Sequence, residues 1–192
     1  MWLTTLYEHP TPSLQWGTVL GASLVAAFWD LRSRRIPNLL TFPLVLGGWA
    51  ASACFSGGAG LVDSLAATVI LATPFVLLFV FAGGGAGDAK LMGGLGAWLG
   101  VVNGLVVLLA VCVCGMVLAV VAAARKRRLG AVLGNVSGAM IGLLQPVFGV
   151  GSLRDAGRLM PGPGEGQQMP YGLAIFAGTA VAAGGLWLCR TL

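Results

Sequence analysis

Long apolar runs with almost no charged residues constrain the fold of this sequence more than any other feature. A membrane-spanning helix needs roughly 20 mostly apolar residues, and five runs meet this requirement. A sixth run, 89–101, offers only about 13 residues, or ~20 Å of helix. With 9% charged and 57% hydrophobic residues, the chain is not a small soluble domain. We therefore predict an all-α, polytopic membrane protein, a single domain over 1–192. The expected transmembrane helices, about six in number, are 13–29, 38–55, 62–82, 89–101, 104–124 and 171–189.

Basic residues predict the orientation of these helices. Arginines follow the first and fifth runs, and Lys90 follows the third. The positive-inside rule places these connections in the cytoplasm, so we expect the N-terminus outside and the catalytic loops inside. The apolar stretch 129–150 has basic residues on both sides, which favours a cytoplasmic, interfacial segment at about 129–169 over a further span. The net charge of +5 favours anionic lipid as a partner and gives no support for nucleic acid.

Two carboxylates are expected to meet at the cytoplasmic face. Asp30 ends the first run and Asp88 precedes the fourth, whereas Asp63 begins a helix on the outer side and is interpreted as a helix cap. Two carboxyl groups that share a site do not both ionise readily, so one can activate water while the other supplies a proton. The alternative is that both aspartates are ordinary charges at the membrane interface that balance the nearby Arg35 and Lys90.

The residues before Asp88 are small. Gly85 and Gly87 leave room for an extended substrate backbone to approach this aspartate. A flexible hinge between two helices is the other explanation for these glycines.

Four further residues are candidates for binding substrate or tuning the carboxyl groups. Lys90 and Arg35 can bind a substrate carboxylate or alter the protonation of an aspartate, although membrane anchoring explains them equally well. Pro170 and Tyr171 begin the last run on the catalytic side, where they can line a cleft. The sequence has one histidine and no C-x-x-C pair, so we expect no metal and no other cofactor.

Three short strings together resemble one family. Asp30 is followed by R-I-P-N, a G-x-G-D-x-K string ends at Lys90, and an M-P-Y-G string opens the last run. This pattern is similar to that of the type IV prepilin peptidases, the G-x-G-D class of membrane aspartic proteases. The resemblance extends over about 29–178 and implies that Asp30 and Asp88 are catalytic. It also implies cleavage of short basic leader peptides from pilin-like precursors, at the cytoplasmic face of the bacterial inner membrane.

The sequence differs from the large bifunctional members of that family. Those members carry an N-terminal cytoplasmic segment with paired C-x-x-C motifs, which is not found here, so N-methyltransferase activity has little support. The compact size resembles the peptidases of tight-adherence (Flp) pilus systems. From the residues alone, a multi-pass transporter or channel, or a non-catalytic scaffold of a secretion machine, remains an alternative. The oligomeric state is left open.

Overall fold

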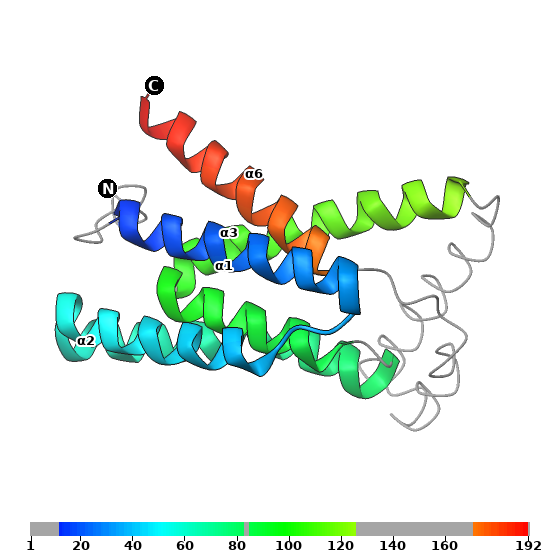
Figure 1. Ribbon diagram of the computed structural model, residues 1–192. Helices are drawn as coiled ribbons and strands as arrows, with labels where there is room; N and C mark the ends of the chain where they lie inside the picture. The colour runs from blue at the N-terminus through cyan, green and yellow to red at the C-terminus, as the bar shows by residue number, and fades with distance from the viewer. Residues whose placement is uncertain (1–11, 83–84, 126–170, 192) are drawn as a thin grey trace, which may run out of the picture.

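The described part of the chain is entirely helical apart from short connections. A computed structural model describes residues 12–82, 85–125 and 171–191, and no strand occurs among them. The expectation of an all-α protein is confirmed for these residues. The expected interfacial segment 129–169 and Pro170 lie outside them. The helices are α1 (Pro12–Ser33), α2 (Asn38–Ala82), α3 (Ala86–Arg125) and α6 (Tyr171–Thr191), labelled as in Figure 1.

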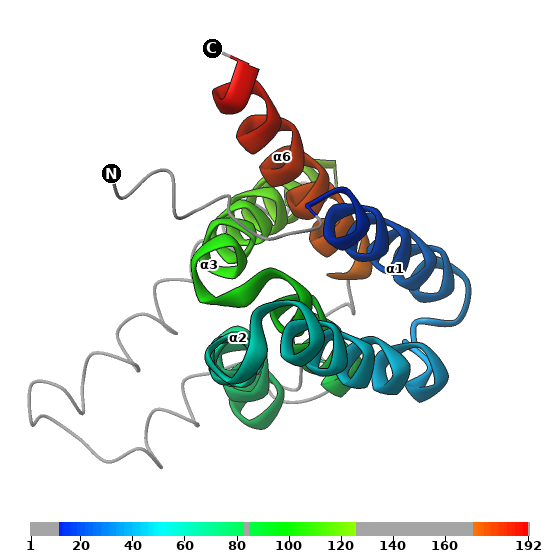
Figure 2. The same ribbon diagram turned by 90° about the vertical axis from the view of Figure 1, so that its left-hand side faces the viewer.

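Helix α2 reverses its direction at Gly57. This residue has φ 66° and ψ −155°, a backbone conformation open essentially to glycine alone. Trp49 Nε1 donates a hydrogen bond to Thr68 Oγ1 at 3.0 Å, 19 residues further along the chain. A straight helix would separate these two residues by about 28 Å. The two arms of α2 therefore lie side by side as a hairpin (Figures 1 and 2).

Helix α3 makes a similar reversal at Gly100, which has φ 71° and ψ 179°. Before this turn, Gly96 lies against the backbone of Ala67. After the turn, Gly104 lies against Leu71. The second arm of α3 therefore runs along the second arm of α2 in the direction opposite to that of the first arm of α3. Both turns lie at the end of the molecule opposite the start of α3.

Asp63 helps to form the turn in α3. Its two carboxylate oxygens lie 3.3 and 3.4 Å from the backbone nitrogen of Val101, which donates to them. Val101 begins the second arm of α3, where a backbone N–H has no partner within its own helix. The cap expected at Asp63 is therefore present, but it serves the neighbouring helix rather than the helix that carries Asp63.

Three of the described helices, α2, α3 and α6, are long and apolar enough to cross a membrane. Their outward side chains include many large apolar residues, such as Leu39 at 86% and Leu109 at 68% exposure. So much outward apolar surface is typical of a protein that meets lipid. For the described residues, the expectation of an all-α protein suited to a membrane is thus confirmed, with three such helices, whereas the number of about six spans stays a prediction.

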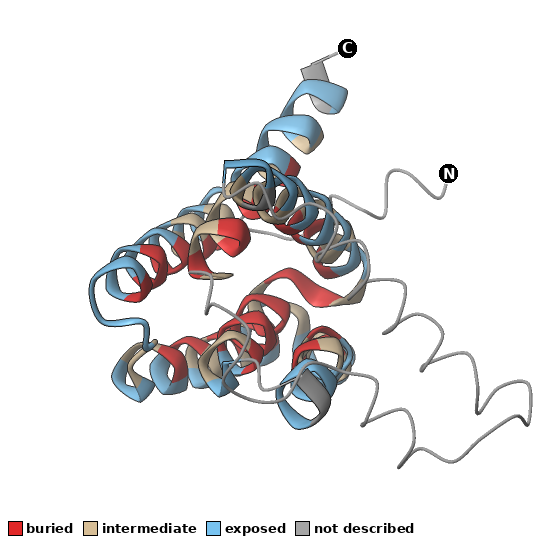
Figure 3. Cartoon of the chain, turned by 90° about the vertical axis from the view of Figure 1, so that its right-hand side faces the viewer, coloured by how far each residue is buried: buried red, intermediate tan, exposed pale blue. Residues whose placement is uncertain are grey.

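The first arm of α3 forms the centre of the described structure. Leu91, Met92, Leu95 and Leu99 are all at most 2% exposed. Helix α3 packs against α2 and α6, and α6 also packs against α1. Figure 3 shows that the buried residues lie where the helices face one another. Most of the short run 89–101 is therefore buried against neighbouring helices.

We predict that Gly100→Ala destabilises the protein by about 1–3 kcal/mol, because alanine strongly disfavours this backbone conformation. Thermal unfolding of the purified protein in detergent measures the effect. Gly58→Ala is the matched control, since a methyl group there meets no atom within 4 Å. Equal unfolding temperatures for the two variants would show that the turn at Gly100 does not depend on glycine.

Candidate active site

Asp30 lies in the last turn of α1 and is buried, with 7% of its surface exposed. Its Oδ2 atom accepts a hydrogen bond of 2.8 Å from the backbone N–H of Gly172, at the start of α6. The helix ends soon afterwards at Arg34, which has φ 52° and donates its backbone N–H to the carbonyl of Asp30 at 2.8 Å. The N-terminus of α6 thus binds the Asp30 carboxyl group through a backbone N–H, a position that favours a negative charge.

Asp88 lies in the first turn of α3 and is half-buried. Its backbone N–H donates to the carbonyl of Gly85 at 3.2 Å, which begins the helix. Its carboxyl group is near enough to that of Asp30 for the two charges to interact. The structure therefore brings together the two aspartates that the sequence singles out, from helices 58 residues apart in the chain.

The glycines before Asp88 allow two close approaches. A Cβ atom at Gly85 would lie 2.7 Å from Asp88 Oδ2, so glycine leaves space for this carboxyl group. A Cβ atom at Gly87 would lie 3.0 Å from the Cβ of Ile36, in the loop between α1 and α2. Because these two positions are glycines, the Asp88 carboxyl group and the loop that carries Ile36 can both pack closely against the start of α3. Their role in admitting a substrate backbone stays a prediction.

Tyr171 lies beside the pair of aspartates. Its ring packs edge-on against Phe75, with 6.0 Å between the ring centroids and an angle of 82° between the planes. Its hydroxyl group lies against Gly115, and its charge would interact with that of Asp88. Of the two residues expected to line a cleft, Tyr171 is therefore close to the aspartates, and Pro170 falls outside the described residues.

Lys90 points away from Asp88, and Arg35 is exposed. Lys90 Nζ donates to Asn38 Oδ1 at 2.9 Å and lies 5.9 Å from the centroid of the Phe42 ring. Residues two positions apart are about 200° apart around a helix, so Lys90 and Asp88 project from opposite sides of α3. Arg35 is exposed in the loop between α1 and α2, where its carbonyl accepts a hydrogen bond of 3.4 Å from Ser33 Oγ.

Two residues of this region were not singled out from the sequence. Gly172 binds Asp30 through its backbone N–H, and the feature of the sequence that points to it is its place in the M-P-Y-G string. Asn38 binds Lys90, and its signal was its position at the end of the R-I-P-N string. Within 12–82, 85–125 and 171–191, no three His, Cys, Asp or Glu side chains are grouped so that they could hold a metal ion.

A family model described as the type IV leader peptidase family matches residues 18–120. The match covers more than half of the chain and includes both Asp30 and Asp88. The chain belongs to the type IV leader peptidase family. No curated protein and no solved structure matches it. Membership in the type IV leader peptidase family confirms the resemblance seen in the short strings, and it supports a protease of the leader peptidase type in a membrane.

Proposed function

We propose that the protein is an aspartic endopeptidase and that Asp30 and Asp88 are its catalytic residues. The observation that carries this proposal is that the two carboxyl groups, one buried and one half-buried, lie near enough for their charges to interact, within the region that matches the family. A pair of carboxyl groups at one site can activate water for peptide hydrolysis without a metal, because one member stays protonated while the other is ionised.

The mechanism uses one ionised and one protonated carboxyl group. Two close carboxyl groups release their protons in separate steps, which belong to the pair rather than to either residue. The ionised member takes a proton from a water molecule, and the water oxygen attacks the scissile carbonyl carbon. The protonated member donates to the carbonyl oxygen as charge develops there. When the C–N bond breaks, a proton passes to the leaving amine. The Gly172 N–H fixes the orientation of the Asp30 carboxyl group throughout.

The proposed substrate is the precursor of a type IV pilin-like protein, cut between its short basic leader and its apolar helix. Family membership supports a leader peptide as the substrate, and precursors of the Flp type are the first to test. Tyr171 is a candidate for contact with this substrate, because it directly precedes Gly172, whose N–H binds the Asp30 carboxyl group.

We further propose that six helical segments cross the bacterial cytoplasmic membrane, with the aspartates at the cytoplasmic face. The segments are α1, the two arms of α2, the two arms of α3, and α6. The reversals at Gly57 and Gly100 support this topology, because both lie at the end opposite the aspartates. The arginines that end α1 and α3 lie at the aspartate end, as the positive-inside rule requires.

This orientation predicts the labelling of single cysteines. In a background without the four native cysteines, Gly58→Cys should react with a membrane-impermeant thiol reagent in intact cells. Ser33→Cys should react only after the cells are permeabilised, because it lies at the aspartate end. Labelling of Ser33→Cys in intact cells would contradict the proposed orientation.

Co-expression of the chain with an Flp-type precursor tests the function. The N-terminus of the pilin, read by mass, should lie directly before its apolar helix. Cleavage in detergent should be the same with and without EDTA, since the two carboxyl groups activate water themselves. An unprocessed precursor, or activity lost to EDTA and restored by zinc, would overturn the proposal.

A further inference from the structure

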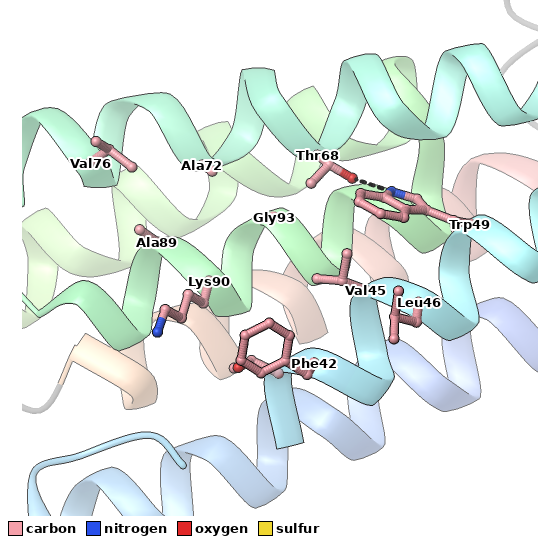
Figure 4. A pocket seen from close by; sticks show the side chains of 11 residues that line it. Phe42, Val45, Leu46, Trp49, Thr68, Ala72, Val76, Ala89, Lys90 and Gly93 are labelled. Atoms are coloured by element: carbon pink, nitrogen blue, oxygen red, sulfur yellow. Dashed lines mark hydrogen bonds between the residues drawn. The ribbon is translucent and has the colours of Figure 1, made fainter. Parts of the chain in front are cut away.

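A groove of about 330 Å³ lies beside α3, on the side from which Lys90 projects and opposite that of Asp88. The two arms of α2 form its walls, and Ala89 and Gly93 of α3 form its floor (Figure 4). The hydrogen bond between Trp49 and Thr68 closes one end. Lys90 lies at the other end, in the same helical turn as Asp88.

The groove has a positive charge at one end and an apolar lining along its length. Lys90 is the one charged residue in a lining that is otherwise apolar except for two threonines. A lysine ammonium has three N–H donors, of which Asn38 Oδ1 accepts one at 2.9 Å. Asn38 and the Phe42 ring hold the ammonium at the mouth of the groove. This division of charge matches a molecule with an anionic head and a hydrocarbon tail.

The charge and the surroundings of the groove favour a lipid as its occupant. One ammonium at the end of an otherwise apolar lining complements one anionic head group and one apolar tail. The walls of the groove belong to α2 and α3, both suited to a membrane, where lipid chains are the surrounding solvent.

We propose that this groove binds one anionic phospholipid, with the lipid phosphate on Lys90 Nζ and one acyl chain between the arms of α2. The phosphate of a zwitterionic lipid already has a cation in its own head group, so Lys90 should favour a lipid with net negative charge. The site is separate from the aspartates, and the proposal does not depend on their catalytic role.

Native mass spectrometry of the full chain in detergent tests the site with phosphatidylglycerol and phosphatidylcholine at equal concentration. We expect one retained phosphatidylglycerol and a preference over phosphatidylcholine of about fivefold, the size expected when one basic residue attracts a lipid with net negative charge. Lys90→Gln should abolish this preference, and Lys90→Arg should keep it. Ala72→Phe, which fills the groove between the arms, should lower the retention of phosphatidylglycerol about tenfold.

Arg32→Gln is the matched control, because it removes an exposed positive charge at the same end of the molecule. This variant should retain phosphatidylglycerol as the unaltered chain does. Equal retention of the two lipids, a preference that survives in Lys90→Gln, or the same loss in Arg32→Gln would overturn the site. If a pilin precursor displaces the lipid, and Ala72→Phe no longer binds the precursor, the groove is a substrate site and the lipid proposal is wrong. If Ala72→Phe does not fold, the comparison of Lys90→Gln with Lys90→Arg decides alone.

Discussion

Asp30→Asn and Asp88→Asn are each expected to lower the rate of leader cleavage by about 10²–10⁴-fold or more, the usual contribution of a positioned acid or base. An amide neither takes a proton from water nor supplies one, and it has nearly the same shape as the carboxyl group. The variants should therefore remain folded and inserted. Cleavage of a precursor by purified protein in detergent, followed by mass, measures the loss.

Asp63→Asn is the control for these two variants. Asp63 lies at the opposite end of the helices, where its carboxylate accepts from the backbone of Val101. Asparagine keeps an acceptor oxygen, so the cost in stability should not exceed about 1 kcal/mol. Its rate of cleavage should equal that of the unaltered chain. Near-normal cleavage by either Asp30→Asn or Asp88→Asn would refute the catalytic pair. An equal loss of cleavage in Asp63→Asn would show that the loss comes from misfolding and not from removal of a catalytic group.

The proximity of Asp30 and Asp88 could be predicted because it follows from simple properties of the sequence. Apolar runs fix where the helices lie, and basic residues fix which of their ends share a side. The glycine turns were predicted less closely. The sequence predicts helix breaks at 55–62 and 101–104, but several glycines occur near each break. The structure has its turns at Gly57 and Gly100, which the sequence pattern does not distinguish from the other glycines.

Contacts between distant helices could not be predicted in this way. The bond between Gly172 and Asp30 joins residues 142 positions apart and uses a backbone N–H, which every residue except proline possesses. Lys90 was grouped with Asp88 because the two are neighbours in sequence. The helical period instead turns Lys90 toward Asn38 and the arms of α2, a contact that nearness in sequence does not reveal.

Gly172→Ala is expected to lower the rate of cleavage about 10–10²-fold. An added Cβ atom would lie 2.9 Å from the Cβ and 3.0 Å from Oδ2 of Asp30, and 3.3 Å from the Cα of Ala27. Asp30 or the start of α6 must therefore shift, and a displacement of about 1 Å at a reacting group can cost 10²-fold in rate. The maximal rate should fall more than the affinity for precursor, because the change moves a catalytic group.

Gly185→Ala distinguishes this effect from a general change in α6. A methyl group at Gly185 meets no atom within 4 Å, so this variant gains only the higher helix propensity of alanine, up to about 1 kcal/mol. It should cleave as fast as the unaltered chain and unfold at the same or a slightly higher temperature. Gly172→Ala should also stay folded, since alanine suits a helix there as well, and its defect should lie in cleavage. If the two variants cleave equally fast, the hydrogen bond from Gly172 does not set the position in which Asp30 acts.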